Sequence, residues 1–306
     1  MDLYMNGKVV VITGGSQGIG KAAALAFAEE GCQVCICARR EERLQETKEE
    51  FAKKGYDLYT RKVDVREQEQ VEAFAQDIVD RYGKIDVWVN NAGANHFQML
   101  LDYSAEEFQD MVSTNLTSVF IGGTAAARRM KQTGGGVILN CSSYAAISPY
   151  AGKAPYAACK SGVLSLTKTM AAEFAPYHIR VVAYIPGAIR TEISRPNFER
   201  MGDMILKDIP CKRAGEPEDL ARALVFLASD AADYINGVAL EISGGKRCVQ
   251  NGKMINNNKM MKGLLWLRIK LRCDRPFFCC YAYRADASGA SSDSFLAQNQ
   301  GKRYNE

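Results

Sequence analysis

Several features that often carry function are scarce in this chain of 306 residues. It has only two histidines, His96 and His178, which excludes a histidine-rich metal centre. No stretch reaches the roughly 20 apolar residues that a membrane-spanning helix needs. The first residues carry neither the basic nor the apolar region of a signal peptide. We therefore expect a cytoplasmic protein with no membrane span and no bound metal.

Charge of one sign is also scarce, because 39 Lys and Arg stand against 35 Asp and Glu. Residues 251–306 hold ten Lys and Arg and four Asp and Glu, so the first 250 residues have a net charge of −2. Such a body excludes nucleic-acid binding through a basic surface. With 47% hydrophobic and 24% charged residues, the composition is typical of a globular protein with a large core.

Cysteine is present in ten copies, yet the pattern does not indicate a disulfide scaffold in a chain of this length. Cys32 and Cys35 form a CxxC motif, but a strand points two such side chains to opposite faces. A zinc site would also need a second pair or histidines nearby. We predict reduced thiols packed as small apolar groups.

Short apolar runs alternate with longer segments of helical period from residue 8 to about 245. This rhythm predicts βαβ units and a parallel sheet covered on both faces. The runs of strand length are 8–13, 33–38, 58–63, 85–90, 137–141, 179–184 and 238–242. The clearest helical patterns are 21–30, 41–53, 67–82 and 154–175.

Two later segments break this rhythm. Residues 188–215 have no clean period, which indicates a loop or a small helical lid. The composition then changes abruptly near residue 251. We therefore expect a single domain over residues 1–250 and a poorly ordered C-terminal appendage over residues 251–306.

Glycines follow the first predicted strand directly. Gly14, Gly18 and Gly20 allow a tight turn, close approach of the backbone to a pyrophosphate, and close contact between a helix and the sheet. The N–H groups at the start of the next helix then face the anion. A glycine cluster by itself is also typical of any strand-to-helix turn, but its place in a doubly wound pattern predicts a dinucleotide site.

Further motifs follow the glycine turn in a fixed order. The set is Thr13-Gly14-x3-Gly18-Ile19-Gly20, Asn90-Asn91-Ala92-Gly93, Asn115, Ser143, Tyr156-x3-Lys160 and Pro186-Gly187-x3-Thr191. Over residues 5–247 the chain resembles the short-chain dehydrogenase/reductase family. The resemblance implies one α/β Rossmann domain, a doubly wound parallel sheet of seven strands in the order 3-2-1-4-5-6-7, with a nicotinamide cofactor at the carboxyl ends of the strands. It also implies a homotetramer or homodimer paired through the helices that carry Asn115 and Tyr156.

The cofactor type is predicted from the end of the second strand. Arg39 and Arg40 stand where an NAD-binding fold has an acid, and guanidinium groups suit a 2′-phosphate. We predict NADP. NAD stays the alternative, because these arginines also fit a solvent-exposed run of charges and because Gln17 stands where many NADP-preferring relatives have a base. The resemblance implies that Asp64 accepts from the adenine amino group. The predicted cofactor-binding residues are Gly14, Ser16, Gln17, Gly18, Ile19, Gly20, Arg39, Arg40, Asp64, Val65, Asn91, Ala92, Gly93, Tyr156, Lys160, Pro186, Gly187, Ile189 and Thr191.

The reacting groups centre on Tyr156 and Lys160, which share one face of a helix. A phenol is a weak acid near neutrality, and a nearby ammonium lowers its pKa. The resemblance implies that Tyr156 is the acid/base, that Lys160 tunes it and binds ribose, that Ser143 orients the substrate and that Asn115 relays protons. The spacing alone also fits an ordinary amphipathic pair. We expect Ser142 to point elsewhere.

The predicted substrate wall mixes apolar and thioether groups with few fixed charges. It consists of Asn95, His96, Ala145, Tyr150, Ala151, Ile193, Phe198, Met201 and Met204. Such a wall suits a moderately apolar ketone or secondary alcohol, such as a hydroxysteroid, a sugar or a polyol.

Two alternative functions stay open. The sequence is similar to 3-oxoacyl-(acyl-carrier-protein) reductases, but the positions where carrier-docking relatives have bases read Gly134 and Tyr177. The bases Arg128, Arg129 and Lys131 lie near those positions. The other alternative is a non-catalytic, cofactor-sensing regulator on the same fold, a type that usually lacks the tyrosine or the lysine.

Overall fold

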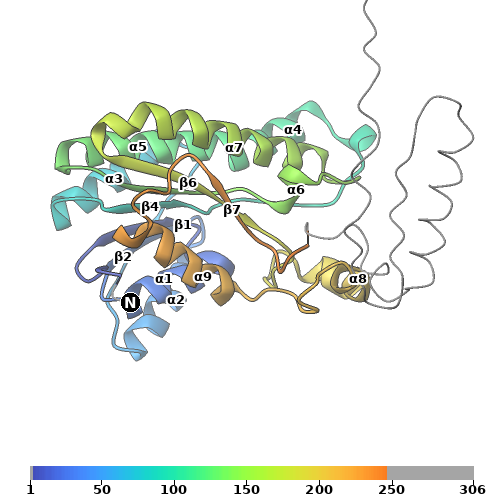
Figure 1. Ribbon diagram of the computed structural model, residues 1–306, viewed down its shortest axis with the longest axis horizontal. Coiled ribbons are helices and arrows are strands. Elements are labelled where there is room, and N and C mark those ends of the chain that lie inside the picture. The colour runs from blue at the N-terminus through green and yellow to red at the C-terminus, as the bar shows by residue number, and fades with distance from the viewer. Residues whose placement is uncertain (1–2, 247–306) are drawn as a thin grey trace, which may run out of the picture. The chain divides into compact units, whose positions relative to one another are not determined.

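The computed structural model describes residues 3–246, in which helices cover both faces of a parallel sheet (Figure 1). All neighbouring strands pair in parallel, in the order β3-β2-β1-β4-β5-β6-β7. The strands are β1 (Val9–Thr13), β2 (Gln33–Ala38), β3 (Leu58–Lys62), β4 (Val87–Asn90), β5 (Gly136–Cys141), β6 (Ile179–Pro186) and β7 (Ala239–Ile242). The predicted Rossmann fold and strand order are confirmed. The predicted appendage, residues 251–306, lies outside the described residues.

Strand ends differ from the sequence prediction by up to two residues. β4 begins at Val87 rather than at residue 85, and the carboxylate of Asp86 accepts the backbone N–H of Val9 at 2.7 Å. The side chain of Asp86 therefore takes the hydrogen bond of the first backbone N–H group of β1. β6 continues to Pro186, which lies opposite Ile242 of β7. This extension places the turn after β6 beside the end of the last strand.

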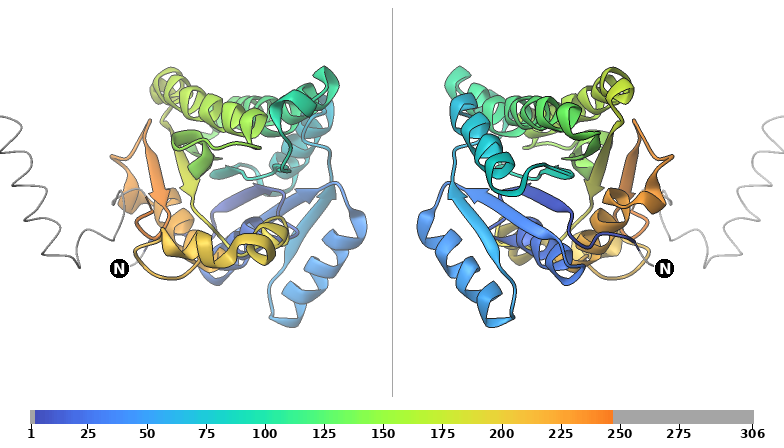
Figure 2. Two further views of the ribbon diagram at one scale, coloured as in Figure 1. Left: turned by 90° about the vertical axis from the view of Figure 1, so that its right-hand side faces the viewer. Right: turned by 90° about the vertical axis from the view of Figure 1, so that its left-hand side faces the viewer.

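Two layers of helices enclose the sheet, as the end-on views in Figure 2 show. One layer consists of α1 (Gly18–Glu29), α2 (Glu41–Lys53) and α9 (Pro217–Ala228). The other consists of α3 (Gln68–Tyr82), α5 (Ser118–Thr133) and α7 (Ala154–Phe174). Phe27 and Leu224 belong to the first core, and Phe74 and Met170 to the second. Two apolar cores explain why the strands read as continuous apolar runs rather than alternating ones.

Short helical segments occur in several connections of the fold. The chain between β4 and α5 forms a 3-10 turn η1 (Leu100–Asp102), helix α4 (Ala105–Val112) and a π-helical turn η2 (Ser113–Thr117). Helix α6 (Tyr144–Ile147) follows β5, and α8 (Arg195–Lys207) follows β6. The remaining 3-10 turns are η3 (Ala175–Tyr177) and η4 (Asp230–Ala232). The segment without a clean period thus contains a helix, α8.

Five of the six cysteines that the structure describes are free and buried, as the sequence predicts, whereas Cys211 is exposed. Cys32 and Cys35 are free, buried, and belong to opposite core clusters. Burial raises the pKa of each thiol to about 12, so both stay protonated at neutral pH. Within residues 3–246 there is no group of His, Cys, Asp or Glu side chains arranged to hold a metal ion. In the same part of the chain no helix combines the length and the apolar character that crossing a bilayer requires.

Candidate active site

The glycine turn between β1 and α1 has a backbone that only small residues accommodate. Gly14 and Gly18 have φ values of +66° and +53°, in the left-handed region. A Cβ at Gly20 would lie 2.3 Å from the carbonyl oxygen of Gly14, so the helix can approach the strand only with glycine there. No side chain caps α1, and its first N–H groups therefore remain available to an anion. These features fit a pyrophosphate.

Asn91 braces this turn from the neighbouring strand. Its Nδ2 donates to the carbonyl oxygens of Thr13 at 3.1 Å and Gly14 at 3.2 Å. The hydroxyl of Thr13 accepts from the backbone N–H groups of Asn91 and Ala92, each at 3.0 Å. The hydroxyl of the buried Tyr184 donates to Asn91 Oδ1 at 3.2 Å. Asn91 is predicted to line the cofactor, and its side-chain amide group donates its hydrogen bonds to the backbone of the glycine turn.

The two arginines after β2 lie beside the glycine turn and are exposed. The guanidinium of Arg40 donates to the side-chain oxygen of Gln17, which belongs to that turn. Arg43, further along α2, lies 3.9 Å from Glu192 in the loop after β6. The structure therefore brings positive charge from β2 to the turn even though the turn itself contains no base.

Asp64 lies after β3, next to the buried Val65, as the sequence predicts. Both of its carboxylate oxygens accept hydrogen bonds from Arg66, the closest at 2.6 Å. These hydrogen bonds hold the pKa of the Asp64 carboxyl below its usual range. No pattern in the sequence indicates that Arg66 occupies the predicted adenine acceptor.

Two serines at the end of β5 point in different directions. Ser143 caps α6 by accepting from the N–H of Ala145 at 3.2 Å, and its hydroxyl lies near the phenol of Tyr156 in the first turn of α7. The hydroxyl of Ser142 instead donates to the carbonyl oxygen of Lys160 at 2.8 Å. Ser143 is therefore the serine beside the phenol, as the sequence predicts.

Lys160 and Asn115 are both buried next to Gly93. The ammonium of Lys160 donates to the Cys141 carbonyl oxygen at 2.8 Å. Asn115 Oδ1 accepts from the N–H of Ala94 at 3.2 Å. A Cβ on Gly93 would lie 2.9 Å from Asn115 Oδ1 and 3.7 Å from Lys160 Nζ, so both polar groups border the same space. The fold thus brings together the four residues that the sequence predicted as reacting groups.

The local electrostatics of Tyr156 differ from the sequence expectation. Burial raises the pKa of the phenol above its ordinary value, and the nearby hydroxyl of Ser143 opposes that rise. We expected Lys160 to lower it. The ammonium instead lies 5.8 Å from the centroid of the tyrosine ring and is hydrogen-bonded to a carbonyl oxygen. At neutral pH the phenol is therefore in its protonated, proton-donating form.

The π-helical turn that carries Asn115 was not visible in the sequence. Asn115 Nδ2, in the widened turn η2, donates at 3.1 Å to the carbonyl oxygen of Met111 in the last turn of α4. Such turns are rare and frequently occur at functional sites. The turn directs the carboxamide inward and leaves it fully buried.

The segment after β6 returns to the glycine turn. Gly187 donates its N–H to the Ile242 carbonyl oxygen at 3.0 Å, which anchors the start of this segment at the sheet. A Cβ on Gly18 would lie 3.3 Å from the methyl group of Thr191, so the two segments are in near contact. The other predicted residues of these two segments are Ser16, Ile19, Pro186 and Ile189. Both segments therefore border one site at the carboxyl edge of the sheet.

One buried cation near the predicted substrate wall was missed. Lys153, one turn before Tyr156, is 2% exposed, and its ammonium donates to Asn95 Oδ1 at 2.8 Å. Phe97 from the same loop is exposed, as are the predicted wall residues Tyr150, Ile193 and Met204. The side chain of Met201 lies outside what the structure describes. The predicted wall therefore has exposed apolar side chains, and one buried positive charge, that of Lys153, is hydrogen-bonded to its residue Asn95.

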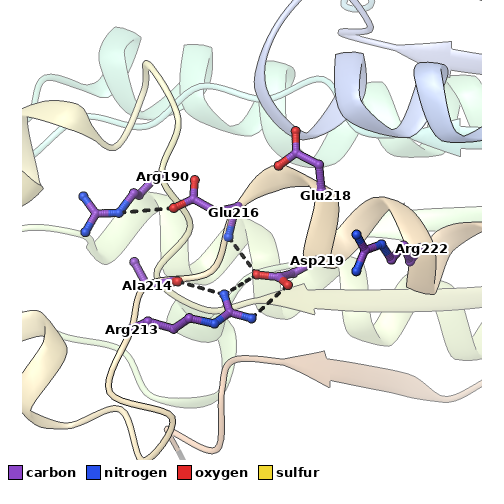
Figure 3. A pocket seen from close by; sticks show the side chains of 7 residues that line it. All are labelled: Arg190, Arg213, Ala214, Glu216, Glu218, Asp219 and Arg222. Atoms are coloured by element: carbon purple, nitrogen blue, oxygen red, sulfur yellow. Dashed lines mark hydrogen bonds and ion pairs between the residues drawn. The ribbon is translucent and has the colours of Figure 1, made fainter.

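A separate hollow of about 490 Å³ lies at the start of α9 (Figure 3). Four of its charged groups form two pairs: Arg213 with both carboxylate oxygens of Asp219, and Arg190 with Glu216 at 3.3 Å. It is lined by Arg190, Arg213, Ala214, Glu216, Glu218, Asp219 and Arg222. None of the predicted reacting residues lines it.

Comparison with known proteins places these features in context. A family described as enoyl-(acyl carrier protein) reductase matches residues 14–247. The chain is 38% identical over 245 residues to 3-oxoacyl-(acyl-carrier-protein) reductase FabG of Chlamydia pneumoniae, covering 80% of this chain and 99% of the relative. It is 37% identical over 249 residues to 3alpha-hydroxysteroid dehydrogenase of Mediterraneibacter gnavus, covering 81% and 100%. A crystal structure of a short-chain type dehydrogenase/reductase from Mycobacterium marinum superposes with a TM-score of 0.77 and 38% identity, covering 81% and 98%.

Proposed function

The chain belongs to the short-chain dehydrogenase/reductase family, whose enzymes interconvert CH–OH and C=O groups, and from this premise we propose that it is an NADP-dependent reductase of a moderately apolar ketone. In this proposal Tyr156 is the proton donor and acceptor. Ser143 orients the substrate oxygen, Lys160 supports Tyr156 and the ribose, and Asn115 takes part in the proton relay.

The observation that carries the proposal is the meeting of these four residues next to the glycine turn. The hydroxyl of Ser143 lies near the phenol of Tyr156, and Lys160 and Asn115 border the same space beside Gly93. They come from α7, the end of β5 and the turn η2, segments that are far apart in sequence. An ordinary amphipathic pair on α7 would not require a buried lysine and a buried asparagine that border the same space.

The glycine turn supports a dinucleotide, and the charges beside it support NADP. The uncapped start of α1 offers N–H groups to a pyrophosphate. Arg39 and Arg40 suit a 2′-phosphate, and Gln17 holds Arg40 against the turn, which offsets the missing base there. When bound, the reduced nicotinamide would supply the hydride. NAD is the alternative cofactor, and a comparison of kcat/KM with NADPH and with NADH distinguishes the two.

The proton step follows from the protonation state of Tyr156. Reduction of a ketone leaves a negative charge on the substrate oxygen, and the neutral phenol donates its proton to that oxygen. The hydroxyl of Ser143, near the same phenol, holds the substrate oxygen in reach of it. Oxidation of an alcohol reverses these roles, with the phenolate as the base.

The rim of the substrate wall supports an apolar substrate. Phe97, Tyr150, Ile193 and Met204 expose large apolar side chains from three different connections. Apolar side chains of this kind suit an apolar ligand. Hydroxysteroids and similar secondary alcohols therefore stand first in the substrate class, followed by sugars and polyols.

A second candidate is reduction of a 3-oxoacyl group on acyl carrier protein, favoured by the 38% identity to the Chlamydia reductase. The bases available for an acidic carrier are partly engaged: Arg128 and Arg129 both pair with Glu72. Lys131 lies 4.2 Å from the ring centroid of Tyr177. Reduction of a carrier-bound 3-oxoacyl group far above that of a small ketone would favour this candidate.

The proposal extends to assembly and location. Phe108 on α4 and Phe120 on α5 expose aromatic rings, which supports pairing of two chains through the helices next to Asn115 and Tyr156. A homotetramer or homodimer, a cytoplasmic location and an appendage over residues 251–306 remain parts of the proposal. Light scattering of the full chain and of a chain ending at residue 250 measures the assembly and the contribution of the appendage.

The test of the proposed function is carbonyl-dependent oxidation of NADPH by the purified full chain. A panel of hydroxysteroid ketones, sugars, small aliphatic ketones and a carrier-bound 3-oxoacyl group is followed by loss of absorbance of the reduced nicotinamide. We expect turnover with at least one apolar ketone. Binding of NADPH without turnover of any carbonyl compound would contradict the proposed reductase activity.

A further inference from the structure

Arg66, in the loop between β3 and α3, has no place in the proposed chemistry. Its backbone N–H and its Nε donate to Asp64 Oδ1, each at 3.0 Å. Its Nε and Nη2 donate to Asp64 Oδ2 at 3.0 and 2.6 Å. A carboxylate offers about four lone-pair sites, so Arg66 alone uses the acceptor capacity of Asp64. The carboxylate is thereby fixed in one orientation.

The same guanidinium reaches a second element. Its Nη1 donates at 2.7 Å to Asp110 Oδ1, in the last turn of α4. Helix α4 continues directly into the π-helical turn that holds Asn115. The side chain of Arg66 is 33% exposed and that of Asp64 20% exposed, so both are accessible at the surface of the site. One side chain thus connects the loop after β3 to the helix before Asn115.

We propose that Arg66 is a positioning residue for the adenine end of the cofactor, because it orients the Asp64 carboxylate and ties the β3–α3 loop to α4. An adenine amino group that donates to Asp64 replaces one of the Arg66 N–H groups. The remaining donors keep the carboxylate in place. The planar fork of arginine makes this possible, whereas a lysine would provide only a point charge. The inference rests on the proposed function, since it requires binding of a nicotinamide nucleotide.

The test compares Arg66→Met, Arg66→Lys and Asp110→Asn with the wild-type chain. Calorimetry measures the dissociation constants of NADPH and of 2′,5′-ADP, which carries the adenine end without nicotinamide. We expect Arg66→Met to weaken both ligands about tenfold and by the same factor, because charge-assisted hydrogen bonds are lost. Arg66→Lys should fall between Met and wild type. Asp110→Asn, which keeps the fork on Asp64, should change both constants by less than about threefold.

A second readout separates positioning from general damage to the fold. At saturating NADPH, kcat of Arg66→Met should match that of the wild type, while KM for NADPH rises with the dissociation constant. A fall in kcat with unchanged binding would overturn the proposal. Tighter binding of 2′,5′-ADP in Arg66→Met would also overturn it, because Arg66 would then be a competitor of adenine.

The inference and the proposed function fail in different ways. A wild-type chain that binds NADPH, together with variants that bind equally well, would overturn only the role of Arg66. A wild-type chain that binds neither NADPH nor NADH would overturn the proposed function and this inference together.

Discussion

The two halves of the site are built differently. On the side of β4, β5 and β6, the polar groups of Lys160, Asn115 and Ser142 are buried and hydrogen-bonded to the backbone. On the side of β2 and β3, Arg39, Arg40 and Arg66 place charged side chains at or near the surface. The half proposed to react, here the reacting half, is therefore held by packing, and the half proposed to select the cofactor, here the selecting half, offers accessible charge.

The difference teaches where each kind of change should act. A buried polar group that loses its partner incurs the full desolvation cost and disturbs its neighbours. An exposed charge loses only a screened interaction and leaves the fold intact. Substitutions in the reacting half should therefore reduce kcat, and those in the selecting half should change KM and cofactor preference.

Tyr156→Phe should give the largest effect. Removing the proton donor lowers kcat by about a thousandfold or more, because general acid catalysis supplies roughly that factor. NADPH binding, measured by calorimetry, should stay within a few-fold of wild type. Tyr234→Phe, which removes a hydroxyl from a fully exposed ring, is the matched control and should leave kcat unchanged. Near-normal turnover of Tyr156→Phe would contradict the assignment of Tyr156 as the proton donor.

Arg39→Ala should come second and act on preference alone. Loss of a charge-assisted contact to the 2′-phosphate should reduce the ratio of kcat/KM with NADPH to that with NADH by about ten- to a hundredfold. The value of kcat at saturating NADPH should not change. Arg222→Ala on α9 is the matched control for removing an exposed positive charge. An unchanged ratio of kcat/KM values would contradict a contact between Arg39 and the 2′-phosphate.

The pH dependence sharpens the comparison from the side of Tyr156. Because burial raises its pKa, the neutral phenol is present throughout neutral pH and is lost only above the raised pKa. Ketone reduction should therefore be level from pH 6 to 9. Alcohol oxidation needs the phenolate and should rise by about tenfold per pH unit over the same range. An oxidation rate that levels off near pH 7 would show that bound ligands lower the pKa.

Salt should produce the smallest effect and separate the two halves most simply. At 0.5 M salt the Debye length falls to about 4 Å, which screens the exposed arginines. KM for NADPH should rise several-fold, whereas kcat and the KM for a neutral ketone should stay nearly constant. A fall in kcat of the same size would mean that the reacting half also depends on exposed charge.

Much of this organisation could be predicted from the sequence. Apolar runs and helical periods located every strand, because burial on both sides leaves a continuous apolar signal. The strand order and the reacting residues came from motif resemblance, and the fold brings Ser143, Tyr156, Lys160 and Asn115 together. Ser142 could be set aside because adjacent residues on an extended chain point in opposite directions.

What could not be predicted depends on partners distant in sequence or on backbone detail. Lys153 and Asn95 are 58 residues apart, and Arg66 and Asp110 are 44 apart. Neither contact leaves a local pattern in the sequence. The raised pKa of Tyr156 was missed for a related reason, since local spacing reveals the nearby lysine but not the burial.

The place of β1 in the middle of the sheet has a consequence for synthesis of the chain. β1 pairs with β2 on one side and with β4 on the other, so its second neighbour is completed only when Asn90 has left the ribosome. Until then one edge of the earliest strand offers unpaired N–H and C=O groups to any other extended chain. Truncated products that stop before Val87 should therefore precipitate, whereas those that include β4 should gain in solubility.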